Sequence, residues 1–532
     1  MDLILEPTIP VKIEKMKQRV QWQHQSIVQR GIDQTSMVID DGKEDSEEFS
    51  FMVIGDSGTT CQDGHHPQRE IAKLMLQHRH ECRFVLHTGD VIYTVGSREY
   101  YPSNFIEPYR EFLRGGENPQ NITYDNMVFD TPILTTLGNH DYYDVPLMYR
   151  VITGPTLQLR RLLRYKDIEI GWHGSEQGDA YAKAFLDYLA RFNQQQKLEL
   201  HLDQHYTAKT NNGRCLRYQP GHFTRLPNRY YTFRYGGIDF FALDSNTINE
   251  PSPIPETPQG DMRRKALIER RDEIDVQEQQ ILEEYDKLDL DNPEDAQKSD
   301  ELEAILSQIN EVKVDIEKQL ASHDPNVDFE QLEWFKQRLI ESWNNSEVRA
   351  RIVYFHHPPY VTEASKWYQA QTLAVRRRLR WVFDEVAQTI GNLNGDMPKA
   401  SGGGDRPIVD LILNGHAHCL EHLYTTDTGQ ADSHINCIVS GGSGHYPRRQ
   451  RNTGSELMET FDYISGSPIR KVADSLLFIG RKGYESLERF AYSGIRIDVK
   501  AGNPVKFVVK PFVAERFGHQ WNYPDIEPFV IG

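Results

Sequence analysis

The sequence has few cysteines and no long apolar run. Five cysteines are scattered among 532 residues, and none forms a C-x-x-C pair. An odd number of scattered cysteines is typical of a reducing compartment and argues against a disulfide framework. No stretch approaches the roughly 20 apolar residues that a membrane helix needs, and the charged segment after Pro10 differs from a secretory signal. We therefore expect a cytoplasmic protein without a membrane anchor.

Positive charge is scarce as well. Lys and Arg number 60 against 78 Asp and Glu, which gives a formal net charge of -18. This excess of negative charge repels a nucleic-acid backbone at long range, so we expect no nucleic-acid partner. An anionic small substrate would need a local cation, and buried metal ions would supply one.

Five short stretches each end an apolar run with a side chain that binds hard metal ions. They read Gly55-Asp56-Ser57-Gly58, Gly89-Asp90-Val91-Ile92-Tyr93, Gly138-Asn139-His140-Asp141, Val353-Tyr354-Phe355-His356 and Gly415-His416-Ala417-His418. Their donors are numerous enough for two metal ions: Asp56, Asp90, Tyr93, Asn139, His356, His416 and His418. Asp90 is the natural bridge between the ions. A phenolate favours Fe(III), an amide oxygen suits a divalent ion, and the whole set favours hydrolysis of a phosphate ester.

Seven apolar runs of strand length predict strands that are covered on both faces. They lie at residues 51–54, 84–86, 133–137, 240–243, 352–355, 411–413 and 435–439. Helical patterns at 68–80 and 329–343 lie between some of these runs, which predicts a layered α/β fold. Five of the runs lead directly into a ligand-bearing stretch. The candidate ligands are therefore expected at the carboxyl ends of strands, where open α/β sheets build their sites.

The spacing of the motifs predicts a catalytic domain over residues 49–515. Residues 1–48 are expected to form a helix, at 13–29, and a linker, and residues 516–532 a C-terminal tail. About 217 residues separate Asn139 from His356, which is too long for one connection and requires insertions. One insertion, at 149–229, is predicted to carry a helix at 179–195 and to shape the substrate cleft.

A second insertion, at 258–322, has a heptad pattern. Leu267, Ile274, Ile281 and Leu288 recur every seven residues, and apolar residues at 3/4 spacing follow up to Leu320. This pattern predicts an antiparallel helical hairpin of coiled-coil type, with its arms within 263–320. The hairpin either packs on the globular domain or serves as an arm for a protein partner or for self-association.

The five ligand-bearing stretches resemble the signature blocks of the purple acid phosphatase branch of the calcineurin-like metallophosphoesterases. The segments 230–245 and 440–444 are similar to further parts of that family's pattern, so the resemblance covers residues 49–447 without the insertions. The resemblance implies a four-layer α/β/β/α sandwich with an inserted hairpin. It also implies two metal ions and attack on phosphorus by a metal-bound hydroxide.

The resemblance implies a role for each candidate residue. A ferric site would be held by Asp56, Asp90, Tyr93 and His418, and a divalent site (iron, zinc or manganese) by Asp90, Asn139, His356 and His416. His140 matches the histidine that contacts the phosphate and helps to protonate the leaving group. His357 either binds substrate or satisfies a hydrogen bond at the surface.

The sequence is compatible with three functions. The leading hypothesis is a phosphomonoesterase acting on a small phosphate ester. The second is a phosphodiesterase with the same metals, acting on cyclic nucleotides or lipid headgroups, and the third is a scaffold that acts through its hairpin. A Ser/Thr protein phosphatase is disfavoured because Gly58 stands where that branch has a metal-binding histidine. Tyr93 likewise lies in a motif whose sequence is different in the Ser/Thr protein phosphatases.

Overall fold

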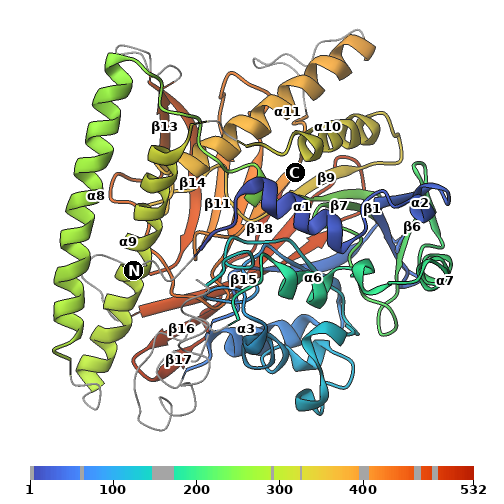
Figure 1. Cartoon of the computed structure of the whole chain (residues 1–532), viewed down its shortest axis with the longest axis horizontal. Coiled ribbons are helices and arrows are strands. Elements are labelled where there is room, and N and C mark those ends of the chain that lie inside the picture. Colours follow the sequence, from blue (N-terminus) through green and yellow to red (C-terminus); the bar gives the residue numbers. More distant parts are fainter. Residues whose placement is uncertain are drawn as a thin grey trace.

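The chain folds into two large β-sheets with helices packed on them (Figure 1). A computed structural model describes residues 5–59, 65–145, 173–288, 293–323, 326–394, 406–460, 469–481 and 489–532. The α/β class predicted from the sequence is therefore confirmed. All seven predicted strands and both predicted helices between them are present, with bounds that shift by a few residues at most.

The smaller sheet carries three of the ligand-bearing loops. Its order is β17-β16-β15-β2-β3-β4, and β18 pairs with β16. The strands are β2 (Phe49–Ile54), β3 (Cys82–His87), β4 (Ile133–Thr135), β15 (Arg489–Val499), β16 (Phe507–Phe517), β17 (Gln520–Asn522) and β18 (Phe529–Ile531). Because β2, β3 and β4 run parallel, their carboxyl ends meet at one edge. Asp56, Asp90 and Asn139 follow at that edge.

The larger sheet carries the other two loops. Its order is β13-β14-β11-β12-β10-β9-β8-β7-β1-β6-β5. The strands are β1 (Ile32–Ile39), β5 (Ala208–Thr210), β6 (Gly213–Tyr218), β7 (Tyr231–Tyr235), β8 (Ile238–Ala242), β9 (Ala350–Tyr354), β10 (Leu411–Asn414), β11 (Leu420–Thr425), β12 (Asn436–Ser440), β13 (Glu456–Thr460) and β14 (Ile469–Ile479). Strands β8, β9, β10 and β12 are parallel, so His356 and His416 leave the sheet at the same edge.

Aromatic side chains join the two sheets. Phe51 and Phe84 of the smaller sheet lie edge to face with Phe240 of the larger one, at ring distances of 5.6 and 5.5 Å. All three rings are fully buried. Each such pair adds about 0.5–1.5 kcal/mol beyond the burial of its area. This packing fixes one sheet against the other and so fixes the distance between their ligand-bearing loops.

Helices pack on both sheets. Helix α3 (Pro67–His78) contacts β15 and β16. Helices α10 (Phe329–Trp343) and α11 (Ala370–Asn394) share a hydrophobic cluster with the larger sheet. Leu332, Phe335 and Leu339 of α10 are buried there, and their spacing of three and four residues puts them on one helix face. Of the described helices, none has the length and apolarity to cross a bilayer.

The N-terminal segment differs from its prediction. Two helices, α1 (Ile9–Arg19) and α2 (Gln25–Val28), replace the single helix expected at 13–29, because Gln21 and Gln23 have positive φ between them. Residues 32–39, within the predicted helix and linker, form β1 and pair with β6 and β7. Buried Gln34 donates to the Val20 carbonyl at 2.8 Å. The polar residues of this strand are therefore paired inside the protein, which hides the strand in the sequence.

Two other segments also differ in detail. The predicted C-terminal tail contains β17 and β18, which pair with β16. The predicted helix at 179–195 is replaced by α6 (Asp179–Phe185) and α7 (Gln195–His205), because the chain turns extended at Leu186 and bridges to Leu226. Residues 146–172 lie outside the described part of the chain. The cleft-shaping role of the insertion and the domain boundaries stay predictions.

The second insertion forms two long helices, α8 (Pro258–Tyr285) and α9 (Pro293–Ala321), which lie side by side (Figure 1). Lys298 of α9 pairs with Glu284 of α8 at 2.6 Å. Near the other end, Arg263 of α8 donates to Gln319 of α9 at 2.9 Å. The beginning of one helix is thus opposite the end of the other, so the two run antiparallel. Helix α9 also packs on the globular part of the chain, against α11.

Candidate metal centre

The five loops bring all seven predicted ligands together at the shared edge of the two sheets. Each of the seven is at most 4% exposed. The four that have positive φ, between 46° and 68°, are Asp56, Asp90, His416 and His418. This backbone region is uncommon for residues other than glycine, and strained residues cluster at functional sites. The loops therefore hold these side chains in a fixed, sharply turned arrangement.

One half of the centre gathers around the Tyr93 hydroxyl. This oxygen lies 2.9 Å from Asp56 Oδ1, 2.8 Å from Asp90 Oδ2 and 3.1 Å from His418 Nε2. A phenol has one proton and can donate it to one acceptor at a time. The Tyr93 hydroxyl can therefore donate to only one of the two neighbouring carboxyl groups at a time. A cation bound among these four side chains would be coordinated by all of them. We call Asp56, Asp90, Tyr93 and His418 the tyrosine half.

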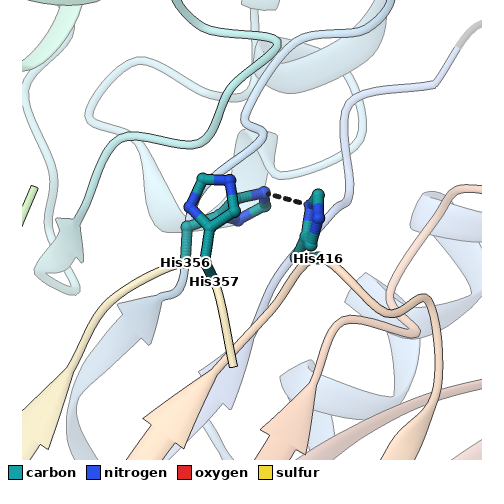
Figure 2. Close-up of side chains that lie close together, drawn as sticks. All are labelled: His356, His357 and His416. Carbon is teal, nitrogen blue, oxygen red and sulfur yellow. Dashed lines mark hydrogen bonds between the residues drawn. The ribbon is translucent and has the colours of Figure 1, made fainter. Parts of the chain in front are cut away.

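The other half gathers around His356 Nε2. This nitrogen lies 3.2 Å from Asp90 Oδ2, 3.0 Å from Asn139 Oδ1 and 3.2 Å from His416 Nδ1. Figure 2 shows the His356 and His416 rings joined by this contact. One ring nitrogen can give at most one proton to these three neighbours. We call this group the histidine half, and Asp90 belongs to both halves.

A hydrogen bond orients the His356 imidazole for a cation. His356 Nδ1 lies 2.9 Å from the Thr88 carbonyl oxygen, so this nitrogen donates and Nε2 faces the centre. A ligand imidazole commonly donates its other nitrogen in this way. His418 Nδ1 is buried without a hydrogen-bond partner in the described part of the chain. Its other nitrogen, Nε2, faces the tyrosine half.

The electrostatics of the centre also favour a cation. Burial and the neighbouring Asp90 charge raise the pKa of Asp56 to about 8, against the opposing effect of His356. Burial would lower the pKa of His356, but the charges of Asp90 and Asp56 and the hydrogen bonds to Asp90 and Thr88 together outweigh it and raise this pKa to about 9. Burial, with the charges of Asp56 and Asp90, raises the pKa of Tyr93 well above its usual range. Without an ion the centre therefore holds protons that an ion would displace.

These pKa shifts predict that Mn²⁺ affinity of the metal-stripped protein rises between pH 6 and pH 8. Below about pH 8 the Asp56 carboxyl is protonated, and each displaced proton weakens binding by about tenfold per pH unit. Calorimetric titration in two buffers with different ionisation heats would measure both the affinity and the protons released. An affinity that stays constant from pH 6 to pH 8 would contradict this account of the centre.

Asp141 supports the loops, a role that the sequence did not reveal. Its buried carboxylate accepts hydrogen bonds from the backbone N–H of Val91 at 3.0 Å and of Gly138 at 2.9 Å. It therefore ties the loop that bears Asp90 to the loop that bears Asn139. In the sequence, only its place as the last residue of the third motif could have indicated this role.

Two glycines are required by close approach. A Cβ at Gly138 would lie 2.0 Å from Asp90 Oδ1, and a Cβ at Gly58 would lie 1.7 Å from the Val91 carbonyl oxygen. Both distances are far below any permitted contact. The position of Gly58 cannot hold a histidine in this backbone, which agrees with the sequence argument against the histidine-containing protein phosphatases.

His140 lies at the edge of the tyrosine half. Its backbone N–H donates to Asp90 Oδ1 at 2.9 Å, and its Nδ1 lies 2.5 Å from the Thr94 carbonyl oxygen. Its Nε2 is 4.0 Å from Asp90 Oδ2. The side chain is 13% exposed, more than any of the seven candidate ligands. His140 can therefore reach both the centre and a bound molecule.

His357 is buried instead of lying at the surface. It sits beside His356 and His416 (Figure 2). Its Nδ1 contacts Ser245 Oγ at 2.8 Å, and its Nε2 lies 3.3 Å from Asn249 Nδ2. Both ring nitrogens are thus used inside the protein, which fits support of the histidine half. The predicted contact with substrate stays a prediction.

His445 is a further neighbour that the sequence did not single out. Its ring stacks on Tyr93 at 4.1 Å with an angle of 16° between the planes, and lies 4.7 Å from the His418 ring. Its Nδ1 contacts Thr59 Oγ1 at 2.9 Å. Burial lowers its pKa to about 3, so the ring is neutral at physiological pH and packs against the tyrosine half without adding charge.

Comparison with known proteins gives only remote structural likenesses. No protein-family model and no curated protein sequence matches the chain. One similar solved structure is GAP50, the anchor in the inner membrane complex of Plasmodium, with 12% identity and a TM-score of 0.37 over 91% of this chain and 88% of that chain. Another is PhoD, with 12% identity and a TM-score of 0.36 over 91% of this chain and 69% of that chain. Likenesses this weak carry no functional argument, so the function is argued from the site.

Proposed function

We propose that this protein is a dinuclear metal-dependent phosphoric ester hydrolase that acts as a phosphomonoesterase. The observation that carries the proposal is the convergence of seven buried donors into two halves that share the Asp90 carboxylate. Such paired sites hold ions about 3.5–4 Å apart and clamp the attacking and leaving oxygens of an in-line displacement. This supports membership of the purple acid phosphatase-like branch of the metallophosphoesterases.

The proposal assigns a different ion to each half. The tyrosine half would hold Fe(III) through Asp56, Asp90, Tyr93 and His418, and the histidine half a divalent iron, zinc or manganese ion through Asp90, Asn139, His356 and His416. The position of the Tyr93 oxygen between Asp56 and Asp90 supports this assignment, because a tyrosinate ligand favours a strongly Lewis-acidic ion. Bound ions would lower the pKa of water and stabilise the charge that develops on phosphorus.

His140 would transfer the proton to the leaving oxygen. Its Nδ1 is committed to the Thr94 carbonyl oxygen, which leaves Nε2 as the nitrogen that exchanges a proton with substrate. The Asp90 carboxylate holds the His140 backbone through its N–H. The same residue therefore organises the cation positions and places the proton donor.

The proposal extends to the layering of the fold, the location of the protein in the cell and its partner surface. We propose a four-layer α/β/β/α sandwich, supported by the two facing sheets with helices packed on them, and a coiled-coil hairpin formed by α8 and α9. A cytoplasmic location is supported by four buried, unpaired thiols among the described residues: Cys82, Cys215, Cys419 and Cys437. A protein partner or a second copy would bind through residues 263–320.

Turnover of two model substrates tests the proposed reaction. A phosphomonoester and a bis-ester of the same phenol would be assayed with metal-loaded protein. Faster turnover of the monoester is expected. Faster turnover of the bis-ester would favour the phosphodiesterase alternative, and turnover of neither with both halves loaded would favour a scaffold.

Replacement of Tyr93 by Phe tests the identity of the ion in the tyrosine half. We expect the wild-type protein to absorb visible light through charge transfer from tyrosinate to Fe(III), and the Tyr93→Phe variant to lose this band. Tyr218→Phe is the matched control, because Tyr218 is also buried but lies on β6, away from the centre. A colourless wild-type protein that is fully loaded and active would overturn the Fe(III) assignment.

A further inference from the structure

A carboxylate from the helical insertion reaches the edge of the candidate metal centre. Glu311 of α9 forms an ion pair with Lys366, and its Oε1 accepts from Arg448 Nη2 at 2.6 Å. The side chains of Lys366 and Arg448 are almost completely buried. Burial would raise the pKa of Glu311, but the charges of Arg448 and Lys366 outweigh it and lower this pKa to about 2. The Glu311 side chain is therefore an anion held by two buried cations.

The two cations flank the candidate ligands. Lys366 Nζ lies 2.9 Å from His416 Nε2, on the opposite side of the ring from the contact with His356. The backbone N–H of Arg448 donates to the His418 carbonyl oxygen at 3.0 Å. Lys366 therefore adjoins the histidine half, and Arg448 is tied to a ligand of the tyrosine half. Together they place two positive charges beside both halves of the centre.

Contacts along one face of α9 hold Glu311 in this position. Glu301 pairs with Arg481 at 3.1 Å. Asp315 accepts from the backbone N–H of Ala370 at 3.0 Å, at the start of α11, and Lys318 pairs with Glu6 at 2.6 Å. Residues 301, 311, 315 and 318 lie close to one side of a helix with 3.6 residues per turn. This side of α9 is thus docked on the globular part of the chain by polar contacts.

A carboxylate between a lysine and an arginine occupies the position that suits a phosphate oxygen. Both anions accept charge-assisted hydrogen bonds from these two cations. The chain as a whole carries a net charge of -18, so a dianionic substrate gains most from local cations of this kind. A phosphate monoester carries one more negative charge than a diester and would benefit more from two extra cations.

We propose that Lys366 and Arg448 recognise the dianionic phosphate of a monoester, and that Glu311 occupies their anion site until substrate displaces it. This inference rests on the proposed function, because it assumes that the adjoining centre takes a phosphate ester. It names the substrate class as dianionic monoesters. It also gives α9 a role at the site, in addition to any role as an arm for a partner.

Binding of inorganic phosphate to the metal-loaded protein tests the inference without relying on turnover. Glu311→Gln keeps the size of the side chain and removes the competing charge, so we expect phosphate to bind about tenfold more tightly than in wild type. Adding Arg448→Met to Glu311→Gln should weaken phosphate binding by about tenfold to a hundredfold, because a hydrogen bond to a charged group is lost. Calorimetry would measure each dissociation constant.

Glu301→Gln is the matched control, because Glu301 lies on the same face of α9 and pairs with Arg481 instead of the two site cations. It should bind phosphate as wild type does. Equal or weaker phosphate binding by Glu311→Gln, with a normal Glu301→Gln, would overturn the inference. If Glu311→Gln does not fold, the Lys366→Met variant can be tested in its place. It should weaken phosphate binding by about tenfold. Unchanged phosphate binding by Lys366→Met would overturn the inference.

Turnover separates failure of this inference from failure of the proposed function. If wild type hydrolyses monoesters but Glu311→Gln leaves phosphate affinity unchanged, only the role of Glu311 is wrong. If wild type hydrolyses neither monoesters nor diesters, the proposed function is wrong. Tighter phosphate binding by Glu311→Gln would then still establish the anion site.

Discussion

Replacement of Asp90 by Asn is expected to lower turnover by about a thousand-fold or more and to leave the fold intact. The Asp90 carboxylate contacts Tyr93 in one half of the centre and His356 in the other. Asparagine has the same shape but no charge, so both cation positions lose a shared anionic ligand. Loss of one preorganised electrostatic group costs about a hundred-fold to a thousand-fold, and this group serves two ions.

Turnover, metal content and circular dichroism of Asp90→Asn would be measured together. Asp498→Asn is the matched control, because Asp498 is also buried and charged but pairs with Arg496 in β15, away from the centre. Its turnover per folded molecule should match wild type. Near-normal activity of Asp90→Asn would refute the bridging role of Asp90.

Replacement of His140 by Gln is expected to lower kcat by about a hundred-fold to ten-thousand-fold for a phosphomonoester with an alkyl leaving group. An alkoxide needs a proton as it leaves, and His140 Nε2 is the nitrogen free to give one. A nitrophenolate leaves without a proton, so its turnover should fall much less. The comparison of the two leaving groups isolates proton transfer from binding.

His422→Gln is the control for the histidine substitution. His422 is buried and contacts Asn436 at 2.9 Å in the larger sheet, so its replacement should affect neither substrate. An equal loss for both leaving groups in His140→Gln would show that His140 positions the centre instead of donating a proton. No loss for either would remove His140 from the mechanism.

Much of the site could be predicted from the sequence, because its ligands follow strands directly. A buried strand is a short apolar run, and a ligand at its carboxyl end needs only a few more residues. His356 follows β9 and His416 follows β10 in this way, and parallel pairing brings them to one edge. Local sequence therefore determines both the element and the place of the ligand.

Glu311 could not be predicted in this way. It lies 55 residues from Lys366 and 137 from Arg448 in the sequence, on a helix with many other charged residues. A glutamate in such a pattern is indistinguishable from one on a solvated helix face. Only the docking of α9 on the globular part of the chain gives it two cationic partners. Strand β1 was hidden for a related reason, since its polar side chains are paired by tertiary contacts.

Turnover of protein with a known metal content, before and after chelation, is the decisive test of a catalytic dinuclear centre. We expect two metal ions per chain in the active protein and hydrolysis of a simple phosphomonoester. We further expect that turnover is lost when the ions are removed and returns when they are restored. Undiminished turnover by the metal-free protein would refute metal-dependent hydrolysis at this centre.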